Sequence, residues 1–530
     1  MPAPPPVTPS SFAFSTLKVN GITNGFSYNN INPQPVIKIS FSAALNPNSI
    51  AGSVTFSSKA GTAVTYTTAY ENHDSTMVIT PSALQPVTQY VLVVSTDLKS
   101  ANNGSLQTGV NVQLTTAVDT TNKFPVISDN ALLDLVQKQT FKYFWDFGHP
   151  VSGMARDRNT SGDVVTTGGS GFGIMAIVAA INRQFITRAD GLARMQKIVA
   201  FLKTAQTFHG AFPHWMNGAT GVVVPFSTQD DGADLVETAY LMEGLLTARQ
   251  YFNGAVATET TLRTDINTLW NAVEWDWFRQ GGQNTLYWHW SPDYGWSTNM
   301  QVNGWDEALI TYVMAASSTT HPITKIVYDN GWALNGTIKN GNSYYGVQLP
   351  LGPPDGGPLF FAHYSFLGIN PNGLSDAYAS YDVQNKAHAM INYNYCVANP
   401  LGNNGYSSSC WGLTASDIEN GYTASSPTND VGVIAPTAAI SSLPYTPTQS
   451  MAALRFFYYK LGDKMWGQYG FYDSFNLTNP WFATSTLAID QGPIIDMIEN
   501  YRSGLLWSLF MSCPEVKTGM KNLGFQSPNL

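Results

Sequence analysis

The hydrophobic period of this 530-residue chain changes once, near residue 120, and that change limits the folds it can adopt. From about 10 to 118, short runs alternate between apolar and polar residues, which is the period of a half-buried β-strand. Such runs occupy 36–41, 76–80 and 90–94, and turns rich in Asn and Gly, such as 102–104, separate them. Short strands joined in this way predict a β-sandwich over 10–118.

The same region resembles the bacterial Ig-like domains, in which P-x-I-x-I-x-F-S is followed later by L-x-P-x-T-x-Y. The two parts of this pattern lie here at 35–42 and 84–91. Domains of this kind are usually spacers or packing partners. We find no residues in this region that indicate chemistry.

A polar linker is expected over 119–127, and after it apolar residues recur at steps of three and four, which predicts helices. Ser128 is placed to cap the first helix. Further helices are expected at 171–183, 188–208, 231–253, 258–278, 304–317, 383–398, 434–460 and 492–512, with long loops at 341–381 and 400–433. About a dozen helices without alternating strands predict a mostly α domain over 128–530, with its helices paired in a ring as an (α/α)6 toroid.

The composition favours a neutral, hydroxyl-rich ligand. Charged residues form 12 % of the chain, about half of the usual share, whereas aromatic residues form 13 % and include 14 Trp. Few charges and many aromatic rings suit the apolar faces and hydroxyls of sugars. The net charge of −9 disfavours nucleic acid, anionic membranes and polyanionic substrates. No run of about 18 apolar residues predicts a membrane span.

The first ten residues and the three cysteines give little information about fold or function. The opening MPAPPPVTPS is Pro-rich and lacks the basic and apolar stretches of a signal peptide, so we expect a flexible lead-in. Cys396, Cys410 and Cys513 are too few for a disulfide framework and do not have the spacing of a zinc site. Cys396 and Cys410 could pair in an oxidising compartment, and the sequence does not decide whether they do.

Hydrolysis of a glycosidic bond needs one carboxylic acid to protonate the leaving oxygen and one carboxylate to activate water or attack. Asp230, Asp234 and Glu237 have helical spacing, which would place them on one face of a helix capped by Thr228. Acidic residues at a helix start also complement its dipole. That structural role explains Asp230 well. It explains Glu237 poorly, because Glu237 lies two turns into the expected helix.

Two more acidic clusters precede or begin helices. Asn303 is placed to cap a helix with Asp306 and Glu307 in its first turn, and Glu307 has apolar neighbours that would raise its pKa as a general acid requires. Asp490 stands just before a helix whose first turn holds Pro493. Each residue could be a plain helix cap. In an (α/α)6 toroid, however, the inner helices are parallel, so their starts meet at one opening and would gather these carboxylates there.

Several longer motifs resemble those of the family labelled "putative glucoamylase", which includes the β-1,2-glucanases of glycoside hydrolase family 144. They occupy 153–158, 226–230, 303–307, 381–388, 489–493 and 498–507. The resemblance extends over essentially all of 128–530. It implies an (α/α)6 toroid, inverting hydrolysis of linear β-1,2-glucan or sophorooligosaccharides, and a secreted, periplasmic or cell-surface location.

The resemblance also implies roles for individual residues. Glu307 corresponds to the general acid and Asp490 to the base. Residues implied in substrate binding are Asp230, Asp234, Glu237, Arg156, Asp157, His214, Trp215, Trp305, Tyr381, Lys386 and Gln491. The stretch 229–234 reads Q-D-D-G-A-D, where the family pattern is I-D-T-A, so subsite details transfer less directly.

Other functions stay open at this point. The chain could hydrolyse another neutral glucan, or bind glycans at a surface without turnover. The choice between endo action and release of sophorose from a chain end is open too. No spacing of His, Asp and Glu indicates a metal, no cofactor is expected, and we expect a monomer. For inversion, the catalytic carboxyl groups should stand about 6.5–9.5 Å apart or further.

Overall fold

The computed structural model describes residues 9–530, so residues 1–8 of the expected lead-in lie outside it. The chain forms two compact units, and the main division falls between Thr121 and Asn122, inside the expected linker. Unit 1 contains the chain up to Thr121 together with the short segments Gly402–Gly405 and Asn476–Trp481. Unit 2 contains Asn122–Leu401, Tyr406–Phe475 and Phe482–Leu530.

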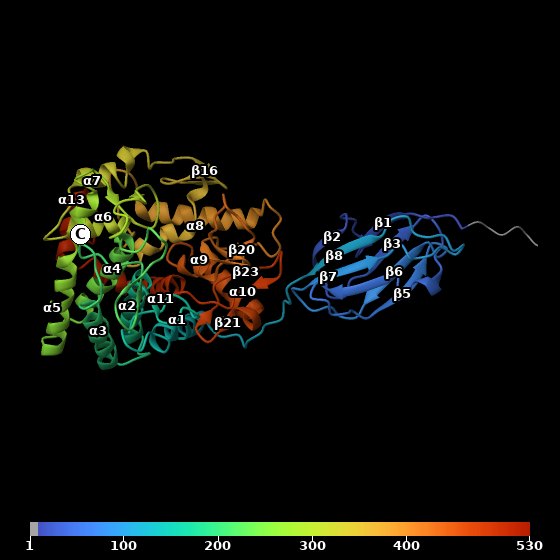
Figure 1. Cartoon of the computed structure of the whole chain (residues 1–530), viewed down its shortest axis with the longest axis horizontal. Coiled ribbons are helices and arrows are strands. Elements are labelled where there is room, and N and C mark those ends of the chain that lie inside the picture. Colours follow the sequence, from blue (N-terminus) through green and yellow to red (C-terminus); the bar gives the residue numbers. More distant parts are fainter. Residues whose placement is uncertain (1–8) are drawn as a thin grey trace, which may run out of the picture. The chain divides into compact units, whose positions relative to one another are not determined.

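Unit 1 is the expected β-sandwich, built from two four-stranded sheets in the orders β1-β3-β6-β5 and β2-β8-β7-β4 (Figure 1). Pairing is antiparallel except between β2 and β8. Alternate residues of β3 and β7, such as Ile37, Ile39, Leu92 and Val94, are fully buried between the sheets. The strands are β1 (Phe14–Val19), β2 (Ser27–Ile31), β3 (Ile37–Phe41), β4 (Val54–Ser58), β5 (Tyr66–Glu71), β6 (Thr76–Pro81), β7 (Gln89–Val94) and β8 (Val110–Thr116).

Unit 2 is a helical toroid whose inner helices are buried around most of their circumference. Such helices are apolar on nearly all sides because they lie between other helices. In α2 every residue from Thr167 to Ile181 is buried, and α6 and α9 are buried throughout. The inner helices are α2 (Thr167–Asn182), α4 (Leu235–Tyr251), α6 (Leu309–Ser317), α9 (Pro436–Ser441) and α11 (Ala488–Ser503).

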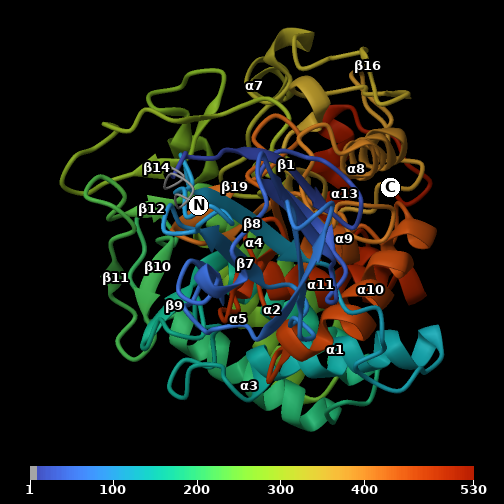
Figure 2. The ribbon, with the colours of Figure 1, turned by 90° about the vertical axis from the view of Figure 1, so that its right-hand side faces the viewer.

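The outer helices pack around this inner set, and Figure 2 shows α1, α3, α8 and α10 placed around α2, α4 and α11. In particular, α1 packs on α11, α3 on α5, α10 on α9, and α13 on α6. The outer helices are α1 (Asp129–Trp145), α3 (Arg188–Leu202), α5 (Ala257–Ala272), α7 (Lys325–Asn330), α8 (Tyr381–Ala398), α10 (Pro447–Met465), α12 (Leu505–Phe510) and α13 (Pro514–Leu523).

Between α6 and α9, short 3-10 helices take the place of a regular inner helix, and η6 packs on α6. Three of these 3-10 helices, η4, η5 and η6, fall in the expected loop 341–381, so that segment is more structured than its composition indicates. The 3-10 helices are η1 (Pro47–Ser49), η2 (Trp275–Arg279), η3 (Leu334–Gly336), η4 (Pro354–Gly356), η5 (Leu359–Ala362) and η6 (Tyr364–Phe366).

Short strand pairs carry the loops at the helix starts, and Figure 2 shows β9, β10, β11, β12 and β14 along one side of unit 2. The remaining strands are β9 (Val164–Thr166), β10 (Trp215–Asn217), β11 (Val223–Val224), β12 (Ala233–Asp234), β13 (Leu286–Tyr287), β14 (His289–Trp290), β15 (Gln301–Val302), β16 (Ser343–Tyr344), β17 (Val347–Gln348), β18 (Ala415–Ile418), β19 (Gly421–Ala424), β20 (Val433–Ile434), β21 (Trp466–Gly467), β22 (Gly470–Phe471), β23 (Phe475–Asn476) and β24 (Trp481–Phe482).

Two expected helices are each divided in the structure. The helix expected at 434–460 is two helices, α9 and α10, with Pro444 in the turn between them. The one expected at 492–512 starts earlier, at Ala488, and breaks at Gly504, whose φ of 66° is left-handed. A proline lacks the N–H for helix continuation, and a left-handed glycine ends a helix.

None of the helices within residues 9–530 is long and apolar enough to cross a membrane. All three cysteines are buried and free, so the structure does not contain the possible Cys396–Cys410 pair. Burial raises the pKa of the Cys396 thiol to about 12.

Candidate active site

The starts of α4, α6 and α11 carry the acidic side chains that the sequence singles out. Asp234 is the N-cap of α4, where its Oδ1 accepts hydrogen bonds from the backbone N–H of Val236 (3.0 Å) and Glu237 (2.9 Å). An N-cap of this kind is worth about 1 kcal/mol of stability. Glu307 stands two residues before α6, and Asp490 lies in the first turn of α11.

The predicted details of these starts are partly wrong. Asp230 lies outside α4, because 230–234 form a loop and the strand β12, which pairs with β14. A Cβ on Gly232 would stand 2.2 Å from the carbonyl oxygen of Trp290, so glycine permits this pairing. Asp306 and Glu307 also precede their helix instead of forming its first turn. Asp490, by contrast, is already inside α11.

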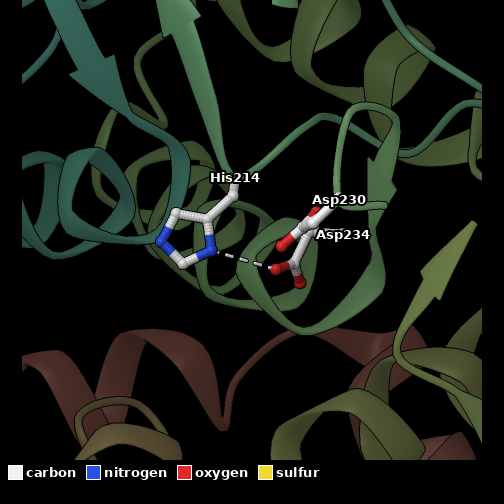
Figure 3. Close-up of side chains that lie close together, drawn as sticks. All are labelled: His214, Asp230 and Asp234. Carbon is white, nitrogen blue, oxygen red and sulfur yellow. Dashed lines mark hydrogen bonds and ion pairs between the residues drawn. The ribbon is translucent and has the colours of Figure 1, made fainter. Parts of the chain in front are cut away.

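Asp230 and Asp234 nevertheless meet, in a cluster with two histidines. Figure 3 shows the His214 ring directed at both carboxylates, with Nδ1 3.1 Å from Oδ2 of Asp234. His289, from β14, places its Nε2 3.3 Å from Oδ2 of Asp230 and 3.4 Å from Oδ2 of Asp234. Asp234 is fully buried, and Asp230 is 7 % exposed. We call His214, His289, Asp230 and Asp234 the histidine–aspartate cluster.

Three residues of this cluster are close enough together to hold a metal ion, since ligand atoms of His214, Asp230 and Asp234 lie within 4.8 Å of one another. The oxygens of Asp234 are already occupied, however. Its Oδ1 caps α4, and its Oδ2 faces ring nitrogens of both His214 and His289. The contacts of 3.1–3.4 Å are hydrogen-bond distances. The cluster is therefore better described as imidazolium–carboxylate pairs than as a set of metal ligands.

Charge in this cluster is balanced between the histidines and the carboxylates. Burial alone would lower the pKa of His214, but the carboxylates of Glu237 and Asp234 outweigh it and raise the pKa to about 9. Burial and the neighbouring Asp234 raise the pKa of Asp230 to about 6. For Asp234 burial is opposed by hydrogen bonds from both histidines, and its pKa is lowered. Near neutral pH, His214 is thus an imidazolium held by carboxylates.

Stability should depend on this imidazolium. Because the pKa of His214 in the folded protein lies above the ordinary 6.5, its stabilisation is complete below pH 6.5 and is lost as pH rises through 9. We expect the melting temperature of the wild type to exceed that of His214→Asn by a gap that shrinks between pH 6.5 and 9.5. His321→Asn, at a half-exposed surface histidine, is the control. A gap that stays constant over this range would contradict the assignment.

Glu307 and Glu237 form the next part of the site. Glu307 is half-buried, and its backbone carbonyl accepts hydrogen bonds from the hydroxyls of Ser365 and Tyr240. Burial, together with the charges of Glu237 and Asp234, raises the pKa of Glu307 to about 7. Burial raises the pKa of Glu237 to about 7 as well, against the effect of His214. Glu307 can therefore carry a proton near neutral pH, as a general acid must.

Glu237 is held by the start of α2, where the N–H of Gly168 donates to its Oε2 at 2.7 Å. A Cβ on Gly168 would stand 2.5 Å from the same Oε2 and 2.8 Å from the Tyr240 ring. We expect Gly168→Ala to lower the free energy of unfolding by about 1–3 kcal/mol, measured by chemical denaturation. Adding Glu237→Ala should recover part of this loss, because it removes one of the two clashes. Additive effects in the double variant would contradict this contact.

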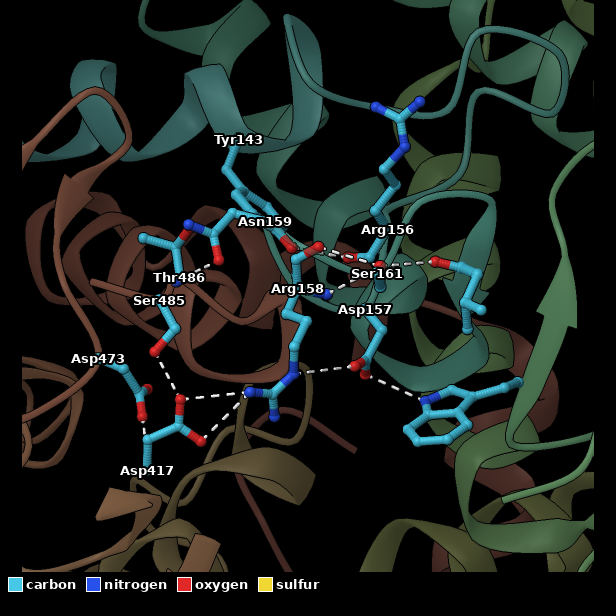
Figure 4. A network of polar contacts seen from close by, with 12 residues as sticks. Tyr143, Arg156, Asp157, Arg158, Asn159, Ser161, Asp417, Asp473, Ser485 and Thr486 are labelled. Carbon is cyan, nitrogen blue, oxygen red and sulfur yellow. Dashed lines mark hydrogen bonds and ion pairs between the residues drawn. The ribbon is translucent and has the colours of Figure 1, made fainter. Parts of the chain in front are cut away.

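Asp490 lies in a second acidic group, which is shown in part in Figure 4. Its neighbour Asp473 follows β22, and Oδ2 of Asp473 accepts the N–H of Asp417 at 2.6 Å. The Asp417 carboxylate contacts Arg158 Nη1 (3.3 Å) and the hydroxyl of Ser485 (2.5 Å). Arg158 Nε in turn stands 3.5 Å from Asp157. Burial and the charge of Asp473 raise the pKa of Asp490 well above its usual range.

Tyr364 connects the two acidic groups. Burial raises the pKa of its phenol first, and the carboxylates of Asp490, Glu307 and Glu237 raise it further. One phenol in η6 is therefore within electrostatic reach of acids from α4, from the start of α6 and from α11. This agrees with the prediction that the starts of these inner helices lie near one another.

Two more predicted residues join this region. The indole Nε1 of Trp215 donates to Oδ1 of Asp157 at 3.0 Å, and the backbone carbonyl of Asp157 accepts the N–H of Ala488 at the start of α11. Burial raises the pKa of Asp157, although Arg158 and Trp215 oppose it. Asp157 thereby lies between the histidine–aspartate cluster and the group around Asp490.

Other predicted residues are held in different environments. The guanidinium of Arg156 donates to the carbonyls of Gly162 and Phe147, and Figure 4 shows it directed away from Asp417. Trp305 and Tyr381 are buried in an aromatic core, Trp305 beside His388 and Tyr381 beside Asp376. Lys386 pairs with Asp382 on α8, and the buried Gln491 donates to Phe471 O. Their contact with a substrate stays a prediction, and these environments give it no support.

Sequence reasoning did not single out Arg158, Asp417, Asp473, Tyr364 or Tyr422. They lie in loops, short strands and a 3-10 helix, where no helical spacing marks them. His289 stands in the aromatic stretch 287–290, where nothing in the local pattern marks it as a partner of Asp234. Its pairing with Asp234 across β12 and β14 depends on the tertiary fold.

Comparison with known families gives three matches. Residues 299–514 match the family described as "Putative glucoamylase". Residues 16–116 match the bacterial Ig-like domain, and 136–234 match a family described only as a protein of unknown function.

Individual relatives agree with the match to the "Putative glucoamylase" family. An exo β-1,2-glucooligosaccharide sophorohydrolase (non-reducing end) from Parabacteroides distasonis is 46 % identical over 420 residues, which are 75 % of this chain but only 58 % of the relative's length. A solved structure from Bacteroides uniformis, titled a "putative glucoamylase", is 56 % identical and covers 77 % of this chain and all of its own, with a TM-score of 0.76.

The endo-β-1,2-glucanase from Chitinophaga pinensis, solved with sophorotriose and glucose, is 50 % identical. It covers 76 % of this chain and all of its own, with a TM-score of 0.75. Unit 2 is homologous to these two solved relatives, because identity is high over their complete length and they share the helical toroid. The chain therefore belongs to the "putative glucoamylase" family, glycoside hydrolase family 144, and carries a bacterial Ig-like domain before its toroid.

Proposed function

We propose that the chain is an inverting glycoside hydrolase that cleaves linear β-1,2-glucan, with Glu307 as general acid and Asp490 as base. The observation that supports it best is that both carboxyl groups, from separate helix starts, are within electrostatic reach of the phenol of Tyr364 and have raised pKa values. The names of the relatives from Parabacteroides distasonis and Chitinophaga pinensis supply the substrate class.

In this mechanism Glu307, whose raised pKa lets it carry a proton near neutral pH, gives its proton to the glycosidic oxygen as the C–O bond breaks. Water attacks the anomeric carbon from the other face, and its proton passes to Asp490. Asp230, Glu237, Asp157, His214 and Trp215 would line this position and bind sugar hydroxyls. The buried Asp234 would hold His214 and His289 in place. Their many charged hydrogen-bonding groups suit a polyhydroxylated neutral ligand.

The test is a panel of linear β-1,2-, β-1,3-, β-1,4- and α-1,4-glucans, with products separated by size. We expect cleavage of the β-1,2-linked polymer and no comparable cleavage of the others. A preference for another linkage would replace the substrate assignment, and binding without turnover on every polymer would contradict the enzyme assignment. Sophorose as the sole early product would indicate exo action, whereas a ladder of intermediate lengths would indicate endo action.

A further inference from the structure

Asp473, which precedes α11 in the chain, contacts the proposed base, Asp490. It lies between β22 and β23, is 3 % exposed, and its carboxyl group interacts with that of Asp490, which is 2 % exposed. Two acidic side chains are thus buried face to face. Burial of two ionised carboxylates in contact costs several kcal/mol unless other groups compensate them.

No such compensation is present around Asp490. Among the described residues, none donates a hydrogen bond to either oxygen of Asp490 or to Oδ1 of Asp473. A contact between two acceptors can be a hydrogen bond only if one of them carries a proton. The pair therefore holds one proton and one negative charge, as two carboxylates sharing a site do.

The surroundings decide which partner carries the charge. Arg158 favours the ionised form of both acids. Asp473 also receives the N–H of Asp417 at 2.6 Å, whereas both oxygens of Asp490 lack a donor. The groups whose charge acts on or faces this pair are Asp417, Arg158, Tyr364 and Tyr422. Of these only Arg158 is a cation. The negative charge therefore belongs on Asp473 and the proton on Asp490.

We propose that Asp473 is a positioning residue of the active site, and that Asp490 and Asp473 accept the proton of the attacking water as one pair with a single negative charge. As the water oxygen bonds to the anomeric carbon, its proton passes to Asp490 and the proton already on Asp490 passes to Asp473, so that the pair then holds two protons. Glu307 has meanwhile given its proton to the departing oxygen. The pair releases one proton and Glu307 regains one, so the cycle consumes only water.

A simpler role for Asp473 would be to fasten the β18 strand by accepting the N–H of Asp417. Asparagine can accept that hydrogen bond equally well, but it cannot carry the charge. Asp473→Asn therefore separates the two roles. A matched control is Asp496→Asn, also on α11, because Asp496 is fully buried and both of its oxygens likewise lack a donor.

In Asp473→Asn the charge must form on Asp490, which lacks the backbone donor that favours the ionised form of Asp473. We expect the acid limb of the pH profile of kcat/KM on β-1,2-glucan to move up by about one unit or more, so that activity at fixed pH on this limb falls about tenfold or more. Asp496→Asn should leave the limb in place. An unmoved limb in Asp473→Asn, whatever its rate, would overturn the proposal.

The catalytic consequence rests on the proposed function, but the shared proton does not. Infrared difference spectra of the substrate-free protein at neutral pH should show a carboxylic-acid band that is lost in Asp490→Asn and altered in Asp473→Asn. If that band is present and β-1,2-glucan is not cleaved, the proposed function fails while the pair stands. If the polymer is cleaved and Asp473→Asn leaves the band unchanged, the pair is wrong.

Discussion

Glu307→Gln is expected to lower kcat on β-1,2-glucan by about 10²–10⁴-fold, the usual contribution of a general acid. Glutamine keeps the shape of the side chain but cannot protonate the glycosidic oxygen. The residue is half-buried, with a pKa raised to about 7 by burial and by Glu237 and Asp234, so the wild type carries the needed proton at neutral pH. The loss should appear in kcat more than in KM.

A substrate with a good leaving group distinguishes loss of the acid from loss of the fold. On a nitrophenyl sophoroside, whose leaving oxygen needs little protonation, Glu307→Gln should lose much less activity than on the polymer. Glu243→Gln is the control, because Glu243 is fully buried on α4 and its Oε1 accepts the Gly368 N–H, which glutamine can also accept. Equal losses on both substrates would contradict the role of Glu307 as acid.

Asp490→Asn is expected to abolish turnover to a similar degree, about 10²–10⁴-fold, while making the protein more stable. The pKa of Asp490 in the folded protein is raised by burial and by Asp473. A carboxyl group with a raised pKa destabilises the fold progressively as pH rises from its ordinary pKa to its raised one. Removing it should therefore add about 1–2 kcal/mol at neutral pH, and less near pH 4.

Melting temperatures of wild type and Asp490→Asn between pH 4 and 8, together with polymer cleavage at each pH, check both parts. Asp496→Asn should also stabilise the protein, since burial raises the pKa of Asp496 as well, but it should keep its activity. A variant at Asp490 that is inactive and also less stable would indicate a structural role for this carboxyl instead.

The fold follows from sequence wherever the hydrophobic period is sustained. The change of period near residue 120 predicts both units, and the main division in the structure falls inside the expected linker. Helix boundaries are less predictable. Asp230, Asp234 and Glu237 have helical spacing, yet the pairing of β12 with β14 delays α4 to Leu235, and Asp234 takes the N-cap position expected for Thr228. Such a strand pair depends on residues more than fifty positions away, which a local pattern cannot include.

The difference between local patterns and contacts to distant residues also explains which residues of the site could be predicted from the sequence. Asp234, Glu237, Glu307 and Asp490 lie at or beside helix starts, so the topology of a toroid brings them together. Asp473 is a single acid in a loop, Asp417 a single acid in the short strand β18, and Arg158 is one of many polar residues in a loop. Only the folded chain shows that Asp417 is held by Arg158 and supports Asp473 through its N–H. The resemblance to a family proposes the catalytic positions but does not include this supporting group.

The most direct test of the account is the anomeric configuration of the first products from β-1,2-glucan, followed by proton NMR during turnover. A general acid at Glu307 and water activated at Asp490 predict that the α-anomer forms first and later converts to the equilibrium mixture. The variants Glu307→Gln and Asp490→Asn should form almost no product. First formation of the β-anomer, or substantial turnover in both variants, would contradict the assignment of these two carboxyl groups.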